Sequence, residues 1–253
     1  MILDTPAPGV HAARSALRHL EKAHALETSD PEMAAFRALT AEEEAATAVI
    51  HSLRRRGYEG AERLKPRNHV HKNSLSQLLE AIQGIIGEAD KAFGLKPQLR
   101  VLEQEAPRRL QLELHGAGLG LGERLLVPVP PLHFLVSTGA DPTNLGPHDF
   151  ADELNKFASA RNAESILAYL KRRANLRNQV LYASAEGVPS IQLGNLLENQ
   201  RRLVKVLITT YLLIDPYSER QHFVQQCVGV LLRMLDLLPT AIDSESAISP
   251  AAT

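Results

Sequence analysis

The chain has 253 residues, of which 44% are hydrophobic and 23% are charged, and its formal net charge is −1. This composition is ordinary for a globular protein with a sizeable core. It excludes a general attraction of the whole molecule to nucleic acid or anionic lipid, so any basic site must be local. A single cysteine, Cys227, excludes an intramolecular disulfide framework, and its apolar surroundings predict a core residue rather than a nucleophile. No signal peptide and no apolar run of about 18 residues is visible, so we expect a cytoplasmic protein with no membrane partner.

The first part of the chain predicts two helices. One is expected over residues 11–27. The second has a clear start signal, because Asp30 can cap it and Pro31 occupies its first helical position. Apolar residues then recur at a spacing of roughly 3.6 as far as Leu53, which predicts a long amphipathic helix.

Three consecutive glutamates, Glu42, Glu43 and Glu44, interrupt the apolar stripe of the second helix. At about 100° per residue, Glu42 and Glu43 lie at the edges of the stripe, while Glu44 points away from it. The first interpretation is a solvated face whose aliphatic stems pack on their neighbours. The alternative is a carboxylate at a helix–helix interface that pairs with an arginine from elsewhere in the chain.

Residues 54–72 are strongly basic, with seven arginines and lysines against two glutamates, a local net charge of +5. An anion or RNA-phosphate site in this stretch would be made by Arg67, Asn68, His69, His71 and Lys72. A solvated basic loop is the alternative. A metal site on His69 and His71, on one side of an extended segment, is disfavoured because Arg67 and Lys72 would repel a cation. No metal or other cofactor is therefore predicted, and a helix is expected to follow from Ser74 to Phe93.

The spacing of apolar residues changes in the middle of the chain. RLQLELH at 109–115 and LHFLVS at 132–137 alternate apolar and polar residues, which predicts strands of a small antiparallel sheet with one buried face. The glycine-rich run 116–122 lacks the register of a dinucleotide or phosphate loop and is expected to connect two strands. The prolines within 125–131 favour an edge position for that stretch.

A helical period returns in the last third, with helices expected over 149–185, 191–214 and 218–238. The predicted fold class is mainly α, a helical bundle with a small antiparallel β insertion in the middle of the chain. The bundle is expected to be discontinuous, and its parts are 11–56 and 148–239, with 57–147 as the insertion and 240–253 as a disordered tail.

Residues 176–184, LRNQVLYAS, place Arg177, Asn178 and Tyr182 inside an apolar helical run. Arg173 and Arg177 share a face with residues that should pack, and a buried arginine requires a partner. Asn178 and Tyr182 are four residues apart and are therefore neighbours on a helix. Two interpretations remain open. One is a site that holds a phosphodiester, and the other is a structural ion pair between Arg177 and Glu42 or Glu43.

The run RNQVLY at 177–182 resembles the signature of the HEPN superfamily, small helical bundles that include many prokaryotic ribonucleases. That signature is an arginine, a polar residue that is often asparagine, three further residues and a histidine. The surroundings are also similar, because an alanine-rich helical hairpin with acidic residues comes early and the helix LENQRRLVKVLITTYLLI follows the motif. The resemblance covers residues 11–56 and 150–238.

The resemblance implies a homodimer whose two motifs face each other across a cleft, in a toxin or antiviral-defence system with an antitoxin or another defence protein as partner. It also implies cleavage of RNA without a metal, by attack of the ribose 2′-hydroxyl on the adjacent phosphate. Arg177 would stabilise the charge of the transition state and Asn178 would orient the phosphate. Contacts to the RNA backbone are expected from Arg67, Lys72, Arg172 and Arg173.

Tyr182 stands where the family has its histidine. A phenol is a poor base at neutral pH, whereas an imidazole exchanges protons there. Proton transfer is therefore expected from Tyr182 as a donor, or from His69 or His71 of the basic stretch. The alternative is a non-catalytic relative that acts as a helical dimerisation or protein-interaction module.

Overall fold

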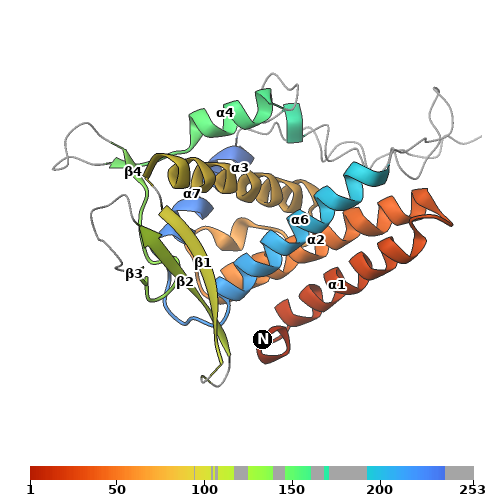
Figure 1. The fold of residues 1–253 in the computed structure, drawn as a ribbon, viewed down its shortest axis with the longest axis horizontal. Coiled ribbons are helices and arrows are strands. Elements are labelled where there is room, and N and C mark those ends of the chain that lie inside the picture. Colours follow the sequence, from red (N-terminus) through yellow and green to blue (C-terminus); the bar gives the residue numbers. More distant parts are fainter. Residues whose placement is uncertain are drawn as a thin grey trace, which may run out of the picture.

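The computed structural model describes residues 1–93, 95–103, 105, 108–116, 125–138, 146–160, 168–170 and 193–236. Over these residues the protein is mainly helical, with a small antiparallel sheet in the middle of the chain, as the sequence predicts (Figure 1). None of the described helices is long and apolar enough to cross a membrane.

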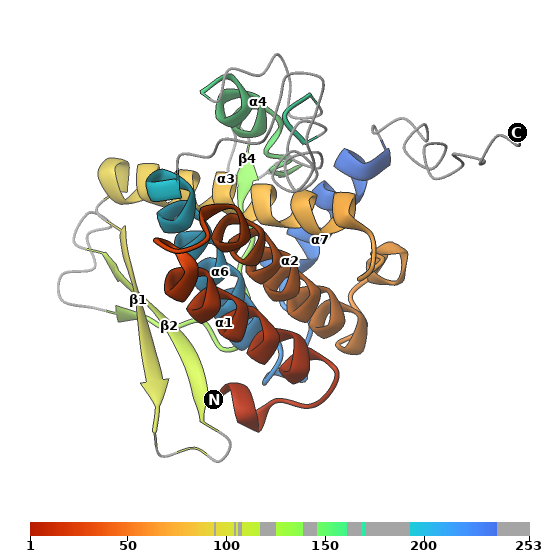
Figure 2. The same ribbon diagram turned by 90° about the vertical axis from the view of Figure 1, so that its right-hand side faces the viewer.

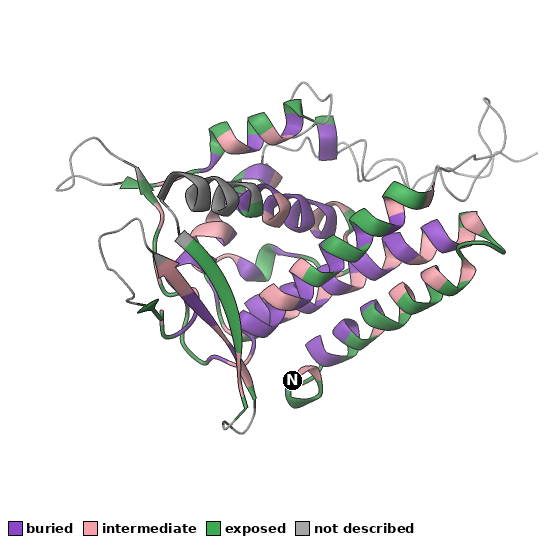
Figure 3. Cartoon of the chain, viewed as in Figure 1, coloured by how far each residue is buried: buried purple, intermediate pink, exposed green. Residues whose placement is uncertain are grey.

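The two N-terminal helices form an antiparallel hairpin. They are α1, Gly9–Leu26, and α2, Pro31–Arg55. Asp30 caps α2 as predicted, since its carboxylate accepts a hydrogen bond of 3.0 Å from the Met33 amide. Small side chains let the two helices approach closely, and fully buried alanines occur on both, namely Ala13, Ala16, Ala38, Ala41 and Ala45. Figure 3 shows that α1 keeps an exposed outer face, whereas α2 is buried over most of its length.

Two C-terminal helices complete the bundle. They are α6, Leu193–Ile214, which packs along α2, and α7, His222–Asp236. Both lie within the predicted ranges. Figure 2 shows α1, α2 and α6 side by side, with α7 on the opposite side from the sheet. A one-turn helix, Ala61–Arg63, follows α2 and packs against it.

The helix α3, His69–Phe93, contacts α2, α4, α6 and α7. Every residue from Lys72 to Leu78 is buried, so this stretch of α3 is surrounded on all sides. The predicted start at Ser74 is wrong by more than one turn, because Asn68 caps the helix earlier. Leu78 belongs to the same hydrophobic cluster as Ile50 and Leu207. Part of the predicted insertion 57–147 therefore shares the core of the bundle.

The sheet has three strands, in the order β1–β2–β3. They are β1, Leu95–Leu102, which was not predicted, β2, Arg109–Gly116, which was, and β3, Leu125–Leu126. The short β3 lies at one edge, which confirms the edge position for 125–126, whereas residues 127–131 form no strand. Leu110 of β2 is buried in the main core, and its carbonyl accepts a hydrogen bond of 2.6 Å from the Tyr217 hydroxyl. This contact anchors the sheet to the segment between α6 and α7.

The predicted strand 132–137 is wrong over most of its length. Only Ser137–Thr138, β4, is a strand, and it pairs with Gly146–Pro147, β5. The preceding segment bonds mainly to α7 and to Gln221 just before it, and the Val136 carbonyl also accepts from the His148 amide. The side chain of Gln221 accepts from the Leu132 amide at 2.6 Å, and that of Gln226 bonds both backbone groups of Val136. Side-chain amides thus satisfy backbone groups that a neighbouring strand would otherwise bind.

The helix α4, Ala151–Ser159, covers the first part of the helix predicted over 149–185. Figure 1 shows α4 above α3. Most of the remainder, together with the glycine-rich run 117–124 and the tail 240–253, lies outside the described residues.

Candidate functional site

The candidate site lies where α2 meets the start of α3, and Glu43 is its centre. This carboxylate belongs to the face of α2 that packs inward, and the residue is only 8% exposed. Glu42 is also buried, at 1% exposure. The solvated-face interpretation of Glu42 and Glu43 is therefore wrong. Glu43 lies at a helix–helix interface, as the alternative expected, but its described partners on α3 are a histidine and a lysine rather than an arginine.

The start of α3 is set by Asn68. Its side-chain oxygen accepts hydrogen bonds from the amides of Val70 (2.8 Å) and His71 (3.2 Å), and its carbonyl accepts from the Lys72 amide. This is the bonding of a helix N-cap, in which the side chain satisfies backbone donors of the first turn. His69 and Lys72 are then three residues apart in a helix, which places them on one face.

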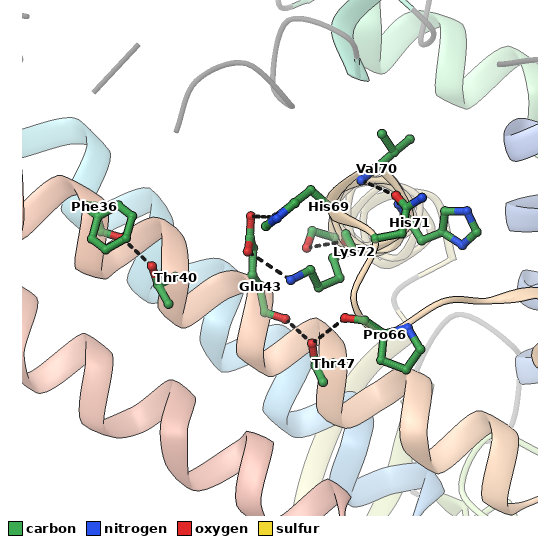
Figure 4. Close-up of polar contacts among 11 residues, drawn as sticks. Phe36, Thr40, Glu43, Thr47, Pro66, His69, Val70, His71 and Lys72 are labelled. Atoms are coloured by element: carbon green, nitrogen blue, oxygen red, sulfur yellow. Dashed lines mark hydrogen bonds and ion pairs between the residues drawn. The ribbon is translucent and has the colours of Figure 1, made fainter. Parts of the chain in front are cut away.

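That face is turned toward Glu43 (Figure 4). The Nδ1 atom of His69 lies 2.7 Å from Glu43 Oε1, and Nζ of Lys72 lies 3.0 Å from Glu43 Oε2. Each carboxylate oxygen thus has its own nitrogen partner. Thr47, one turn further along α2, donates to the Glu43 carbonyl at 2.8 Å and contacts the Pro66 carbonyl at 3.4 Å, which connects the loop before α3 to α2.

The charge of Glu43 fixes the tautomer of His69. Burial alone would raise the pKa of the Glu43 carboxyl, but the hydrogen bond from His69 and the charge of Lys72 outweigh it and hold the pKa below the ordinary value of 4.5. Glu43 is therefore ionised at neutral pH and can only accept, so Nδ1 of His69 must carry a proton. In the neutral imidazole the basic lone pair then lies on Nε2. A carboxylate that orients an imidazole in this way is the arrangement of a general acid–base pair.

Accessibility differs sharply within the cluster. The side chain of His69 is 48% exposed, so a ligand in solvent can reach it. Lys72 is only 6% exposed and has its ammonium on Glu43. The expectation that Lys72 contacts an RNA backbone therefore does not fit its position, and its role is electrostatic support of Glu43. Arg67 is exposed in the turn before α3, as a backbone-contacting residue requires.

His71 points to the other side of α3 (Figure 4). Its Nδ1 atom accepts a hydrogen bond of 3.1 Å from the Lys65 amide. The two imidazoles therefore do not lie on one side of an extended segment, because helix α3 already includes both. Within the part of the chain that the structure describes, no group of three histidine, cysteine or acidic side chains could hold a metal ion.

The other predicted site residues, Arg172, Arg173, Arg177, Asn178 and Tyr182, lie outside the described residues. The ion pair expected between Arg177 and Glu42 or Glu43 therefore stays a prediction. Among the described residues, the partners of Glu43 are His69 and Lys72. Sequence reasoning named all three side chains but did not bring them together, although an asparagine just before HVHK was the available signal for a helix start.

Cys227 behaves as predicted from the sequence. It packs against the main hydrophobic cluster, and burial raises the pKa of its thiol to about 12. Since the thiolate is the nucleophilic form, this cysteine is not a nucleophile at neutral pH.

Comparison with family models, with curated proteins and with solved structures found no match to this chain.

Proposed function

We propose that this protein is a metal-independent endoribonuclease similar to HEPN proteins, acting in a toxin or antiviral-defence system. The observation that supports the proposal best is the pair formed by Glu43 and His69, an accessible imidazole held in one tautomer by a buried carboxylate. It supplies a proton-transfer group of the kind that the motif lacks, because Tyr182 stands in the place of the motif histidine.

In the proposed reaction, Nε2 of His69 takes the proton of a ribose 2′-hydroxyl. The 2′-oxygen then bonds to the adjacent phosphorus, and the bond from phosphorus to the 5′-oxygen breaks. Tyr182 donates a proton to the leaving 5′-oxygen, so the products are a 2′,3′-cyclic phosphate and a 5′-hydroxyl end. Arg177 stabilises the charge on the phosphate, Asn178 orients it, and the proposed assembly is a homodimer.

Backbone contacts in this proposal come from Arg67, Arg172 and Arg173, which neutralise neighbouring phosphates. Lys72 has a different role. Its ammonium keeps Glu43 ionised and thereby keeps the proton of His69 on Nδ1. An antitoxin or another defence protein would control the activity by covering the same cleft.

The test is a cleavage assay on labelled tRNA and total RNA in EDTA, with end-group analysis of the products. General acid–base groups typically contribute a factor of about 100 to 10,000, so His69→Gln is expected to lower the rate at least about 100-fold. Arg177→Ala should abolish cleavage, and Tyr182→Phe should slow it. His71→Gln is the matched control, because this neighbouring imidazole points away from Glu43, and its rate should stay close to that of the wild type.

Two outcomes would count against the proposal. Full activity of His69→Gln alongside an inactive Arg177→Ala would remove His69 from the mechanism. The absence of cleavage by folded wild-type protein would overturn the ribonuclease proposal and favour the second candidate.

The second candidate is a non-catalytic protein-interaction module. One observation favours it, since the sheet and the segment after β3 expose large apolar side chains, with Leu99 at 50%, Leu126 at 44% and Val129 at 72% exposure. Exposed apolar groups gathered in one part of a surface are typical of interaction sites. Light scattering coupled to size exclusion should then show an oligomer that the double variant Leu126→Ser, Val129→Ser dissociates, with no cleavage of RNA by either protein.

A further inference from the structure

A hollow lies beside α7, and none of the residues that line it belongs to the Glu43 site. Its volume is about 500 Å³, which is within the range of small-molecule sites. One side is formed by α7 and the other by the segment that runs along it. The lining residues of α7 are His222, Gln225, Gln226, Gly229 and Arg233, and those of the other side are Leu135, Pro147, His148 and Asp149.

Several polar groups of the hollow are already occupied by the fold. The side chain of Gln225 bonds the backbone of Glu59, and that of Gln226 bonds the backbone of Val136 and His148. The imidazole of His148 lies 2.8 Å from a carboxylate oxygen of Glu153. These groups shape the walls but have little capacity left for a ligand.

Three groups remain for a ligand. Arg233 has no acidic partner among the residues that the structure describes. Asp149 uses Oδ1 to accept from the Ala151 amide at 3.1 Å, which leaves Oδ2 as an acceptor. The imidazole of His222 lines the hollow, and the ring of His133 supports it from behind, with centroids 4.1 Å apart and ring planes tilted by 44°.

The side chain of Arg233 is exposed and borders the hollow. A Cβ atom built on Gly229 would lie 3.8 Å from Nη1 of Arg233, so the guanidinium lies over this glycine, one turn back from its own Cα. The rise of an α-helix puts Gly229 roughly 10 Å along the axis from His222. The hollow thus has a guanidinium at one end, the imidazole of His222 at the other and a carboxylate on its rim.

We propose that this hollow binds a ribonucleotide unit. A guanidinium that pairs with no acidic side chain of the described residues matches a phosphate group, for which arginine offers a planar fork of donors. Imidazole rings are a surface on which a base can stack. A carboxylate oxygen accepts from ribose hydroxyls. A ribonucleotide engages all three groups at once, whereas a phosphate ion would engage only Arg233. The proposal does not depend on the proposed ribonuclease activity, because the hollow shares no residue with the Glu43 site.

The test is isothermal titration calorimetry of the intact protein with the four ribonucleoside 5′-monophosphates, their 2′-deoxy counterparts and inorganic phosphate. At least one ribonucleotide should bind, and more tightly than phosphate. Arg233→Met should weaken it at least tenfold, and Gly229→Leu should abolish it by filling the space beneath the guanidinium. Asp149→Asn, which retains an oxygen that can accept from the Ala151 amide, should reduce the difference in affinity between ribonucleotides and deoxynucleotides.

Two controls keep the result specific. Arg220→Met removes another exposed arginine next to α7, one that pairs with Glu59 and does not line the hollow, and should leave binding unchanged. His69→Gln should also leave it unchanged, which separates this site from the cleavage site. Thermal unfolding followed by circular dichroism verifies that each variant is folded.

A short RNA with a 5′-phosphate distinguishes the two sources of the ligand. If the RNA binds at least tenfold more tightly than the mononucleotide, and Arg233→Met removes this difference, the ligand is an RNA end. If the two bind with equal affinity, the ligand is a free nucleotide. The proposal is overturned if no nucleotide binds at millimolar concentration, if phosphate binds equally well, or if Arg233→Met and Gly229→Leu both bind like the wild type.

Discussion

At the scale of single residues, Glu43 decides the chemistry of the candidate site. A carboxylate that is 8% exposed would be unstable alone, and it is ionised here because His69 and Lys72 each hold one of its oxygens. The sequence placed Glu43 at the edge of an apolar stripe, so a buried position could be anticipated. Its partners could not, because they lie 26 and 29 residues further along the chain.

Replacing Glu43 by Gln should destabilise the protein in a pH-dependent way. The loss at neutral pH is expected to be roughly 3 kcal/mol, because the buried ammonium of Lys72 loses its counter-charge. The folded state lowers the pKa of the Glu43 carboxyl below 4.5, so the stabilisation is fully present above pH 4.5 and is lost as pH falls through the lower pKa of the folded state. Urea unfolding of wild type and Glu43→Gln at several pH values between 7 and 3 measures this loss of stability.

Glu44→Gln is the control for this measurement, since Glu44 is on the same helix and outside the cluster. The difference in unfolding free energy between wild type and Glu43→Gln should shrink in the acid range, while that for Glu44→Gln stays small. A difference for Glu43→Gln that is the same at pH 7 and pH 3 would show that the ion pair does not contribute as described.

At the scale of elements, the start of α3 determines whether the site exists. If the helix began at Ser74, as the sequence predicts, His69 and Lys72 would not be constrained to one face. The cap formed by Asn68 adds the first turn and turns both side chains toward α2. The prediction missed this turn because most of its residues are polar and carry no apolar period.

Asn68→Ala should remove this cap and destabilise the protein by about 1 kcal/mol. Its specific signature is faster hydrogen exchange of the Val70 and His71 amides, which lose their acceptor. Asn68→Asp keeps a side-chain oxygen and should behave like the wild type. Unchanged exchange at both amides in Asn68→Ala would mean that the helix start does not rely on this side chain.

At the scale of the whole molecule, α7 organises the segment between the sheet and α4. The side chains of Gln221 and Gln226 form hydrogen bonds with the backbone of that segment. Phe134 stacks on Phe223 with ring centroids 4.8 Å apart. The same docking creates the hollow proposed to bind a nucleotide unit. Apolar and polar residues do alternate in LHFLVS, but its inward side chains pack on a helix. The alternation alone cannot distinguish this packing from that of a strand in a sheet.

Gln226→Leu should release this segment. The Val136 amide loses its acceptor, whereas the Val136 carbonyl keeps the hydrogen bond from the His148 amide. One unsatisfied buried group typically raises the free energy of the folded state by about 1 to 3 kcal/mol. Exchange of the Val136 amide should therefore become faster. Gln225→Leu, which affects the bonds to Glu59 instead, is the matched control and should leave that amide protected. Equal protection in both variants would contradict the described docking.

The sequence by itself determined what depends on short-range pattern. Apolar spacing along the chain predicted α1, α2, α6 and α7, the Asp-Pro signal located the start of α2, and alternation identified β2. These features follow from residues within a few positions of one another, because helices and strands repeat over two to four residues.

Tertiary structure alone decided which side chains meet. It joined Glu43 to His69 and Lys72, enclosed residues 72–78 of α3 and laid 132–136 along α7. Each of these contacts depends on the packing of distant elements, whose free energy is set by complementary surfaces and buried charge. No periodicity within the chain encodes them.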